Sequence, residues 1–244
     1  MAVAVQTSTK TNWSSGDGTL NVPTGTVDGD ILLLFVGGDM SASEDHTYLV
    51  SGFTSLLADT RSHASNAGVD LQGFYRVASS EPASYTVDIN SDNLSGAIMV
   101  RIDGQDTSDA FDASVITGFD DGTEAKIPSI TTTVANTIVI GAVSWDQSKT
   151  QTTLPTGWTE IQHVDVSGYD LSVIYKAYAA TGATGVAQYD LSSASPHVAG
   201  AVAVQPPQAG GTARTLISQA RTQASGRTLA TGRTQASGRT LAGS

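Results

Sequence analysis

The feature that most constrains this chain is a duplication. Four strand-like segments occur in one order and then occur again, in the same order, 100 to 107 residues later. Each is rich in β-branched or aromatic residues and is bounded by Gly, Asp, Asn or Ser, which is typical of strands joined by turns. The first set is GDILLLFVGGD, GFTSLLADT, DLQGFYRVAS and SGAIMVRIDG, and the second is NTIVIGAVSWD, GWTEIQHVD, DLSVIYKAYA and AGAVAVQPP.

The repeated segments predict an all-β protein. We expect a body over residues 1–207 that forms an antiparallel β-sandwich of jelly-roll-like type, built from two duplicated halves at about 20–104 and 127–207. The continuously apolar run from Ile31 to Val36 predicts a strand buried on both faces. Four prolines are expected between strands, where they cannot interrupt a ladder. These are Pro23, Pro128, Pro155 and Pro196.

Two arrangements of the halves fit this pattern. They could form two small sandwiches in tandem, or one sandwich whose halves interleave about a pseudo-twofold axis. We favour the single sandwich, because a half of roughly 100 residues would bury little core by itself. The segment 103–127 also lacks the composition of a free linker, and we expect it to be an acidic loop that crosses between the halves.

A glycine followed by an aromatic residue marks the same point in each half, as Gly52-Phe53 and Gly157-Trp158. This pair predicts a tight turn followed by an aromatic anchor in the core. A second interpretation is that Trp158 stacks on a ligand, and we favour the core interpretation.

Charge divides the chain into two parts. Residues 1–207 hold all 23 carboxylates and seven basic residues, a net −16, whereas residues 208–244 hold five arginines and no acidic residue. An acidic body should repel nucleic acid, and a basic tail should seek an acidic surface. That surface could belong to a partner or to another copy of this protein.

The tail repeats with a period of six residues after one step of seven. Six is even, so an extended strand would present the same face in every repeat, with one reversal near Gln219. The alternative is a disordered low-complexity linker. We favour an extended, repetitive C-terminal arm, with partner-binding residues Arg214, Arg221, Arg227, Leu229, Arg233, Arg239 and Leu241.

The sequence contains no recognisable catalytic constellation. Cysteine is absent, there is no G-x-S-x-G elbow, and the four histidines lie in no motif, so we expect surface or loop histidines. Carboxylates such as Asp28 and Asp30 could offer oxygens to Ca²⁺, but acidic residues at strand ends are mostly turn formers. We therefore expect no enzyme activity, no cofactor and no metal.

Neither end of the chain suggests a membrane protein. Residues 1–13 lack a basic region followed by a long apolar stretch, and the run from Ile31 to Val36 is too short to span a bilayer. We expect a soluble protein without a Sec-type signal, which binds neither membrane nor nucleic acid.

The segments VPTGTVDGDILLLFV, LPTGWTEI, LSVIYKAYAATGAT and AGAVAVQPP, within residues 20–207, resemble a group of bacteriophage and bacterial β-sandwich proteins. The Arg-Thr-Leu tail is similar to short repeats of phage structural proteins. The resemblance implies a virion component, made in the host cytoplasm, that decorates or cements the capsid. Its partners would be the major capsid protein or other virion proteins, and we expect a homo-oligomer, with a trimer as the working hypothesis.

Two other functions stay open. The chain could be a tail fibre or spike whose sandwich loops bind host surface glycans, with Trp145 or Trp158 as the stacking residue. It could also be an extracellular carbohydrate-binding module or hydrolase, although the missing signal peptide counts against that class.

Overall fold

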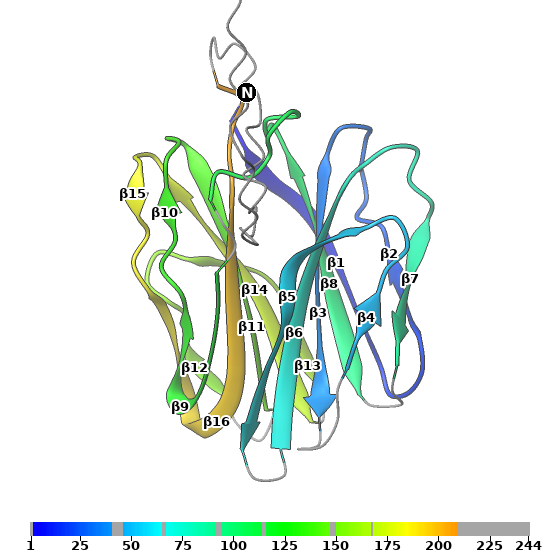
Figure 1. Ribbon diagram of the computed structural model, residues 1–244, viewed down its shortest axis with the longest axis vertical. Helices are drawn as coiled ribbons and strands as arrows, with labels where there is room; N and C mark the ends of the chain where they lie inside the picture. The colour runs from blue at the N-terminus through cyan, green and yellow to red at the C-terminus, as the bar shows by residue number, and fades with distance from the viewer. Residues whose placement is uncertain are drawn as a thin grey trace, which may run out of the picture. The chain divides into compact units, whose positions relative to one another are not determined.

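A computed structural model describes residues 2–40, 46–64, 67–90, 94–113, 116–146, 150–166 and 168–208 (Figure 1). These residues form sixteen strands and no helix, so the predicted all-β sandwich is confirmed. The described part of the chain therefore has no helix that could cross a membrane.

The first half of the body builds a five-stranded antiparallel sheet and the second half a six-stranded one, and five strands of the second sheet repeat the order of the first. The first sheet has the order β1 (Ala4–Trp13), β8 (Ser95–Asp103), β3 (Ile31–Met40), β6 (Ala67–Val77) and β5 (Thr54–Ala64). The matching strands of the second sheet are, in order, β9 (Ile116–Ile127), β16 (Ala187–Val204), β11 (Thr137–Asp146), β14 (Tyr169–Tyr178) and β13 (Thr159–Val166). Every strand of the first sheet thus has its counterpart eight strands later, and the duplication extends to the topology.

Short strands cover the outer face of each large sheet. In the first half, β2 (Gly18–Asn21), β7 (Ser84–Ile89) and β4 (Tyr48–Leu49) form a separate three-stranded sheet. In the second half the equivalent layer is made by residues 124–127 of β9, residues 187–191 of β16 and β12 (Gln151–Thr153). A final pair, β10 (Thr131–Thr132) and β15 (Gly182–Ala183), extends this layer.

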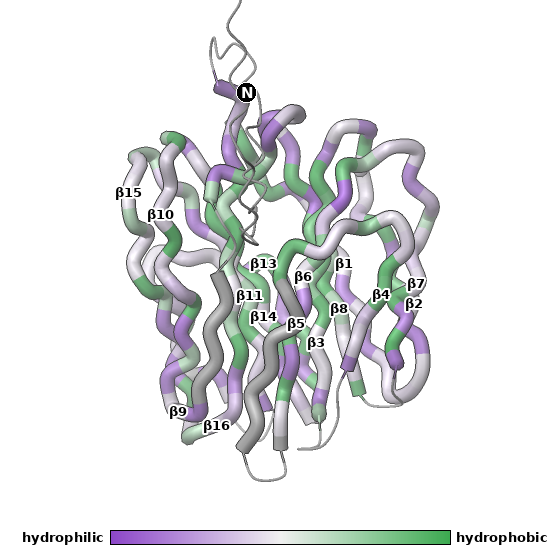
Figure 2. The backbone as a smooth tube through the Cα atoms, viewed as in Figure 1, coloured by the Kyte–Doolittle hydropathy of each residue, from purple (hydrophilic) through white to green (hydrophobic). Residues whose placement is uncertain are grey.

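The body consequently has four layers and three apolar cores. Along β3, the side chains of Ile31, Leu33 and Phe35 enter the central core between the two large sheets. The alternate residues Leu32, Leu34 and Val36 pack beneath the outer layer of the first half. This explains why the run is continuously apolar, and it confirms the predicted strand buried on both faces. Figure 2 shows the same concentration of hydrophobic residues on the inner strands.

The halves do not interleave, contrary to the expectation from the sequence. Each large sheet is made of strands from one half only, and the halves meet through the central core, where Leu33 and Val100 share a cluster with Ile140 and Leu171. The edges also meet crosswise, because β1 lies beside β13 and β5 lies beside β9. Each half would bury little core by itself. Because the two sheets share one core, the halves reach sufficient core volume without exchanging strands.

The structure differs from the expectations in the extent of the acidic loop, in where the halves begin and in the place of one proline. The segment 103–127 is an acidic crossing only up to the start of β9, because residues 116–127 pair with β16 as an edge strand. The two halves therefore begin one strand earlier than the predicted starts near 20 and 127, at β1 and at β9. Pro196 lies inside β16 rather than between strands, next to the register shift between Asp190 and Ser195, where the ladder is already interrupted.

Candidate functional site

The predicted partner-binding arm lies outside the described residues. These end at Gln208, so Arg214, Arg221, Arg227, Leu229, Arg233, Arg239 and Leu241, together with the expected reversal near Gln219, have no structural description. The described chain ends just after β16, where the side chain of Gln205 donates a hydrogen bond to the Asp109 carbonyl oxygen at 2.5 Å. The last described segment is thereby held against residues 105–111 of the body.

Four described cations of the body are held in local contacts. Arg101 Nε lies 2.6 Å from Asp30 Oδ2, Arg76 Nε lies 2.7 Å from Glu81 Oε1, and Lys126 Nζ lies 2.8 Å from Glu124 Oε2. Lys10 donates to the carbonyl oxygen of His163, which joins the edges of the two large sheets. Exposed carboxylates outnumber these cations on the described surface, and they include Asp17, Asp28, Asp88, Asp109, Asp121, Glu160 and Asp165.

Two of the four histidines are buried, which corrects the expectation of surface or loop histidines. His46 is fully buried, and its Nδ1 lies 2.9 Å from Asp70 Oδ2. The hydroxyl of Tyr48 donates to Asp70 Oδ1 at 3.1 Å and lies 3.3 Å from Ser95 Oγ. Burial, and next the Asp70 charge, raise the pKa of Tyr48. Since all four side chains are buried, this cluster serves packing and is closed to a substrate.

The second buried histidine is His197, and His163 is partly exposed. His163 Nε2 lies 2.9 Å from Asp170 Oδ1, and burial raises the pKa of that carboxyl despite the opposing effect of His163. The Trp145 ring packs on His163, 5.4 Å between centroids, and is fully buried. Trp145 is therefore a core residue, and the idea that it stacks on a glycan is wrong. The side chain of His63 lies outside the described residues.

The carboxylates considered for Ca²⁺ serve as turn and ion-pair residues. Asp28 Oδ1 accepts a hydrogen bond from the Ser80 backbone, and Asp30 Oδ2 accepts from both Val27 and Arg101. Within the described ranges, no group of three or more His, Asp or Glu residues could hold a metal ion.

The repeated glycine and aromatic pair forms equivalent turns. Gly52 and Gly157 have φ of 80° and 78°, a left-handed conformation that favours glycine. The residue after each glycine donates its backbone N–H back across the turn, Phe53 to Val50 and Trp158 to Pro155, both at 3.1 Å. Both aromatic side chains are partly buried against an outer core, as predicted.

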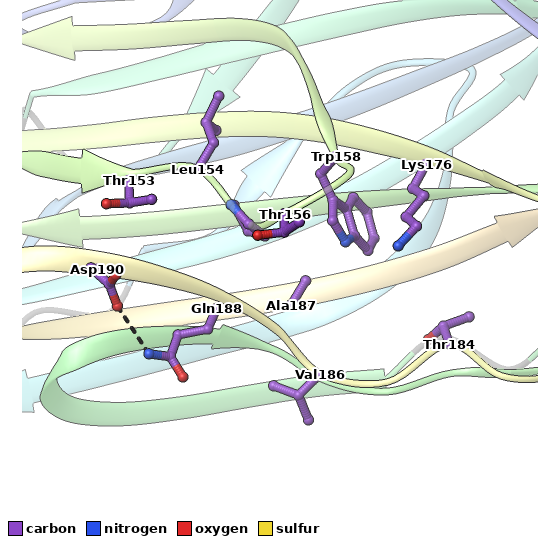
Figure 3. A pocket seen from close by; sticks show the side chains of 11 residues that line it. Thr153, Leu154, Thr156, Trp158, Lys176, Thr184, Val186, Ala187, Gln188 and Asp190 are labelled. Carbon is purple, nitrogen blue, oxygen red and sulfur yellow. Dashed lines mark hydrogen bonds between the residues drawn. The ribbon is translucent and has the colours of Figure 1, made fainter.

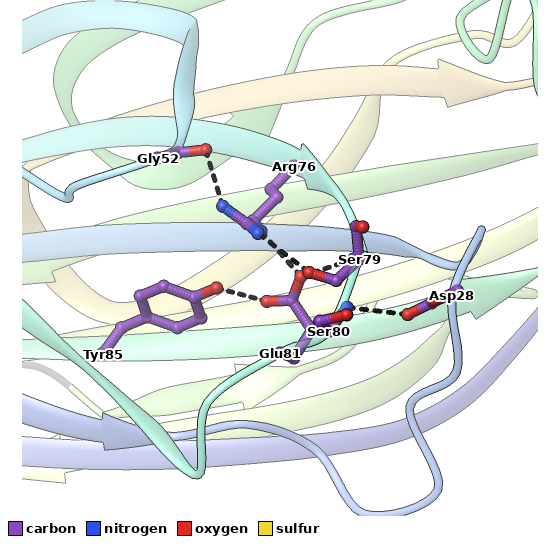
Figure 4. Close-up of polar contacts among 7 residues, drawn as sticks. All are labelled: Asp28, Gly52, Arg76, Ser79, Ser80, Glu81 and Tyr85. Carbon is purple, nitrogen blue, oxygen red and sulfur yellow. Dashed lines mark hydrogen bonds and ion pairs between the residues drawn. The ribbon is translucent and has the colours of Figure 1, made fainter.

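In the first half, the space beside this turn is filled by a polar and aromatic network (Figure 4). The Tyr85 ring packs on Phe53, 5.0 Å between centroids, and lies 5.7 Å from the Arg76 guanidinium. Tyr85 donates its hydroxyl hydrogen to Glu81, whose other oxygen accepts from Arg76 and from the Ser79 backbone at 2.7 Å each. Burial and the Glu81 carboxylate raise the pKa of Tyr85 to about 12.

In the second half, the equivalent space is an open groove (Figure 3). The cavity has a volume of about 300 Å³, and Ala187 lies at its floor at the position that Tyr85 holds in the first half. Trp158 lines one side with Lys176, while Gln188 donates to Asp190 Oδ1 at 2.9 Å on the other. The remaining lining residues are Thr153, Leu154, Pro155, Thr156, Thr184 and Val186.

Strand register supports this equivalence. Tyr85 pairs with Leu20 and Val87 with Gly18, just as Ala187 pairs with Ile127 and Tyr189 with Ala125. The groove was not predicted from the sequence. The sequence does contain a sign of the groove, since aligning SYTVDI with VAQYDL places Ala187 opposite Tyr85. Only the packing of the outer layer shows that alanine at this position opens a space beside Trp158.

Comparison with known proteins yields no relative of this chain. No family model matches the sequence, and no curated protein or solved structure matches it.

Proposed function

We propose that this protein is a non-enzymatic structural component of a bacteriophage particle, which decorates or cements the capsid. The arm, residues 208–244, would attach it to the major capsid protein or to another virion protein, and the body would be displayed. The observation that carries the proposal is the division of charge, because every acidic residue lies in the body and the arm is purely basic. A basic arm of regular repeat is suited to an acidic protein surface.

The contacts of the body support this division. Arg76 and Arg101 are largely buried in ion pairs, and Lys126 is paired with Glu124 on the surface. The described surface of the body is therefore dominated by carboxylates and is poorly suited to bind another acidic surface. In this proposal the basic arm, and not the body, binds the acidic surface of the partner.

Deletion of residues 208–244 tests the proposal directly. Particles assembled with the full chain should carry it after sedimentation through a density gradient, and particles assembled with the chain ending at Pro207 should lack it. A matched variant keeps the arm and changes its five arginines to glutamine, which should also lower occupancy. Wild-type occupancy by the truncated chain would show that the arm is not the attachment.

The full chain also tests the expected trimer. The chain has a mass of 25.0 kDa, so light scattering of the full chain should give three times that value if copies associate. A monomeric mass across the concentration range used for assembly would remove the trimer from the proposal.

A further inference from the structure

We infer that the groove beside Trp158 is a saccharide-binding site in which a pyranose ring stacks on the indole. The inference rests on the second half of the body and is independent of the arm, of the particle and of the proposed function. The two halves are copies of one structural unit, and they differ at this groove.

On the strand beneath the turn, the second half carries alanine where the first half carries tyrosine. Tyr85 fills the space in the first half, where it packs on Phe53 and donates a hydrogen bond to Glu81, which also accepts from Arg76. Ala187 leaves the same space empty in the second half, and phenylalanine is replaced by the larger indole of Trp158. The second half combines the removal of one ring with the enlargement of the other, which gives an aromatic face beside a cavity.

The cation of the groove has also lost its partner. Lys176 stands where Arg76 stands in the first half, and the connection that carries Glu81 there contains no acidic residue here, being AATGATGV over residues 179–186. Among the described residues, Lys176 forms no ion pair, and its Nζ lies 5.4 Å from the centre of the Tyr178 ring. Its amine is thus a hydrogen-bond donor at the rim of the groove.

The opposite rim offers complementary groups. Gln188 and Asp190 lie side by side on β16, and Thr153 and Thr156 come from the segment that leads into the turn (Figure 3). The rim therefore presents an amine, a carboxamide, a carboxylate and hydroxyls around an aromatic wall and a small alanine floor. A pyranose matches this arrangement, because one face of the ring is apolar and its edge carries hydroxyls that both donate and accept. A purely apolar ligand would leave these polar groups without partners.

The size of the groove agrees with a short saccharide. A volume of about 300 Å³ is at the lower end of the range for small-molecule sites. The groove is open along the surface, so a longer glycan can extend beyond it.

The test uses the full chain and an array of oligosaccharides built from neutral hexoses, N-acetylhexosamines and uronic acids. We expect saturable binding of at least one of these, and titration of that oligosaccharide should change tryptophan fluorescence. Gln188→Ala should weaken binding by about tenfold, as expected for loss of one hydrogen bond of about 1.4 kcal/mol.

The decisive variant is Ala187→Tyr. It refills the groove with the side chain that the first half carries at the same register position, so the fold should accommodate it, and circular dichroism and Tm verify this. We expect binding to fall by more than tenfold. Thr86→Tyr is the matched control, because it adds the same side chain at the position of the first half equivalent to Gln188, outside the groove, and should leave binding unchanged.

Three results would overturn the inference. The first is that no oligosaccharide of the array binds at millimolar concentration. The second is that folded Ala187→Tyr binds as the wild type does. The third is that Thr86→Tyr loses binding to the same degree, which would place the ligand elsewhere.

Discussion

The hydroxyl of Tyr169, in the second half of the body, lies directly against the backbone of Gly96, in the first half. A Cβ placed on Gly96 would overlap the Tyr169 hydroxyl oxygen and would lie 3.0 Å from Val164 Cγ1 and 3.1 Å from the Thr11 carbonyl oxygen. Two of these neighbours belong to the second half. The absence of a side chain at Gly96 therefore allows the two large sheets to approach closely at this point.

Gly96→Ala should destabilise the body strongly. The new methyl group has backbone on one side and a buried tyrosine on the other, so the sheets must move apart, at a cost of about 1–3 kcal/mol or more. Urea denaturation measures the change. Gly122→Ala is the matched control, because Gly122 also lies in a strand and a Cβ there would meet only the Glu124 nitrogen, at 3.8 Å. We expect that variant to stay within about 0.5 kcal/mol of the wild type.

Tyr169→Phe should rescue part of the Gly96→Ala defect. The Tyr169 hydroxyl is buried and has no hydrogen-bond partner among the described residues, so its removal in the wild type should cost little. A double-mutant cycle should give a favourable coupling of about 0.5–3 kcal/mol. Additive effects of the two substitutions would contradict the contact.

The body should unfold in one transition, because both halves contribute to the central core. A fragment of residues 2–113 would expose the apolar face that includes Leu33, Leu71 and Val100 and should aggregate or dimerise. Calorimetry of the chain ending at Gln208 should show a single peak whose calorimetric and van't Hoff enthalpies agree. Two separate peaks, or a monomeric and cooperatively folded fragment, would show that the halves are independent.

Glu81→Gln should reduce stability in a way that depends on pH. Burial opposes ionisation of Glu81, but hydrogen bonds from Tyr85, Ser79 and Arg76 dominate and lower its pKa below the ordinary value of 4.5. A depressed pKa in the folded state contributes stability above the unfolded pKa, and this is lost as pH falls through the folded pKa. The variant should therefore lose about 1–3 kcal/mol at pH 7, and the difference should shrink below pH 4.5.

The control for Glu81 is Glu124→Gln, which removes an exposed partner of Lys126. Exposed pairs contribute about 0–1 kcal/mol, so little change is expected at any pH. A loss for Glu81→Gln that persisted unchanged at pH 3 would show that shape, and not charge, is responsible.

Asp70→Ala should be among the most damaging single changes. It removes the partner of a fully buried histidine and one acceptor of the Tyr48 hydroxyl. Leaving a buried polar group without a hydrogen-bond partner costs about 1–3 kcal/mol, and the substitution affects both His46 and Tyr48. Asp88→Ala, at an exposed site on β7, should change the unfolding free energy by less than about 0.5 kcal/mol. Equal stability of the two variants would argue against a structural role for the His46 and Asp70 pair.

Much of the fold was predictable because each strand carries its own signal. Alternation, turn residues and the aromatic after Gly52 and Gly157 are local features, and the duplication doubled their weight. The edge strand β9 was missed because its sequence, ITGFDDGTEAKI, is too polar to be distinguished from a loop. Its backbone pairing with β16 determines its structure.

The candidate site was less predictable. The aromatic Trp158 was recognised, but Trp145 was considered beside it because both are large and flanked by polar residues. The two tryptophans differ in burial, because Trp145 lies under the outer layer and Trp158 lies at its rim. Burial depends on what packs on a strand, and this information lies in residues distant along the chain.

The sequence by itself determined the class of fold, the two equivalent halves and the separation of an acidic body from a basic tail. The first two follow from patterns of hydrophobic and turn residues within short segments, and the third follows from counting charged residues along the chain. Only the tertiary structure decided that the halves keep their own sheets and share one core, that His46 and Asp70 pair in the interior, and that Ala187 opens a groove where Tyr85 closes one. Each of these depends on contacts between segments that are distant along the chain. At the groove, for example, the absence of one aromatic ring decides whether solvent reaches the side of Trp158.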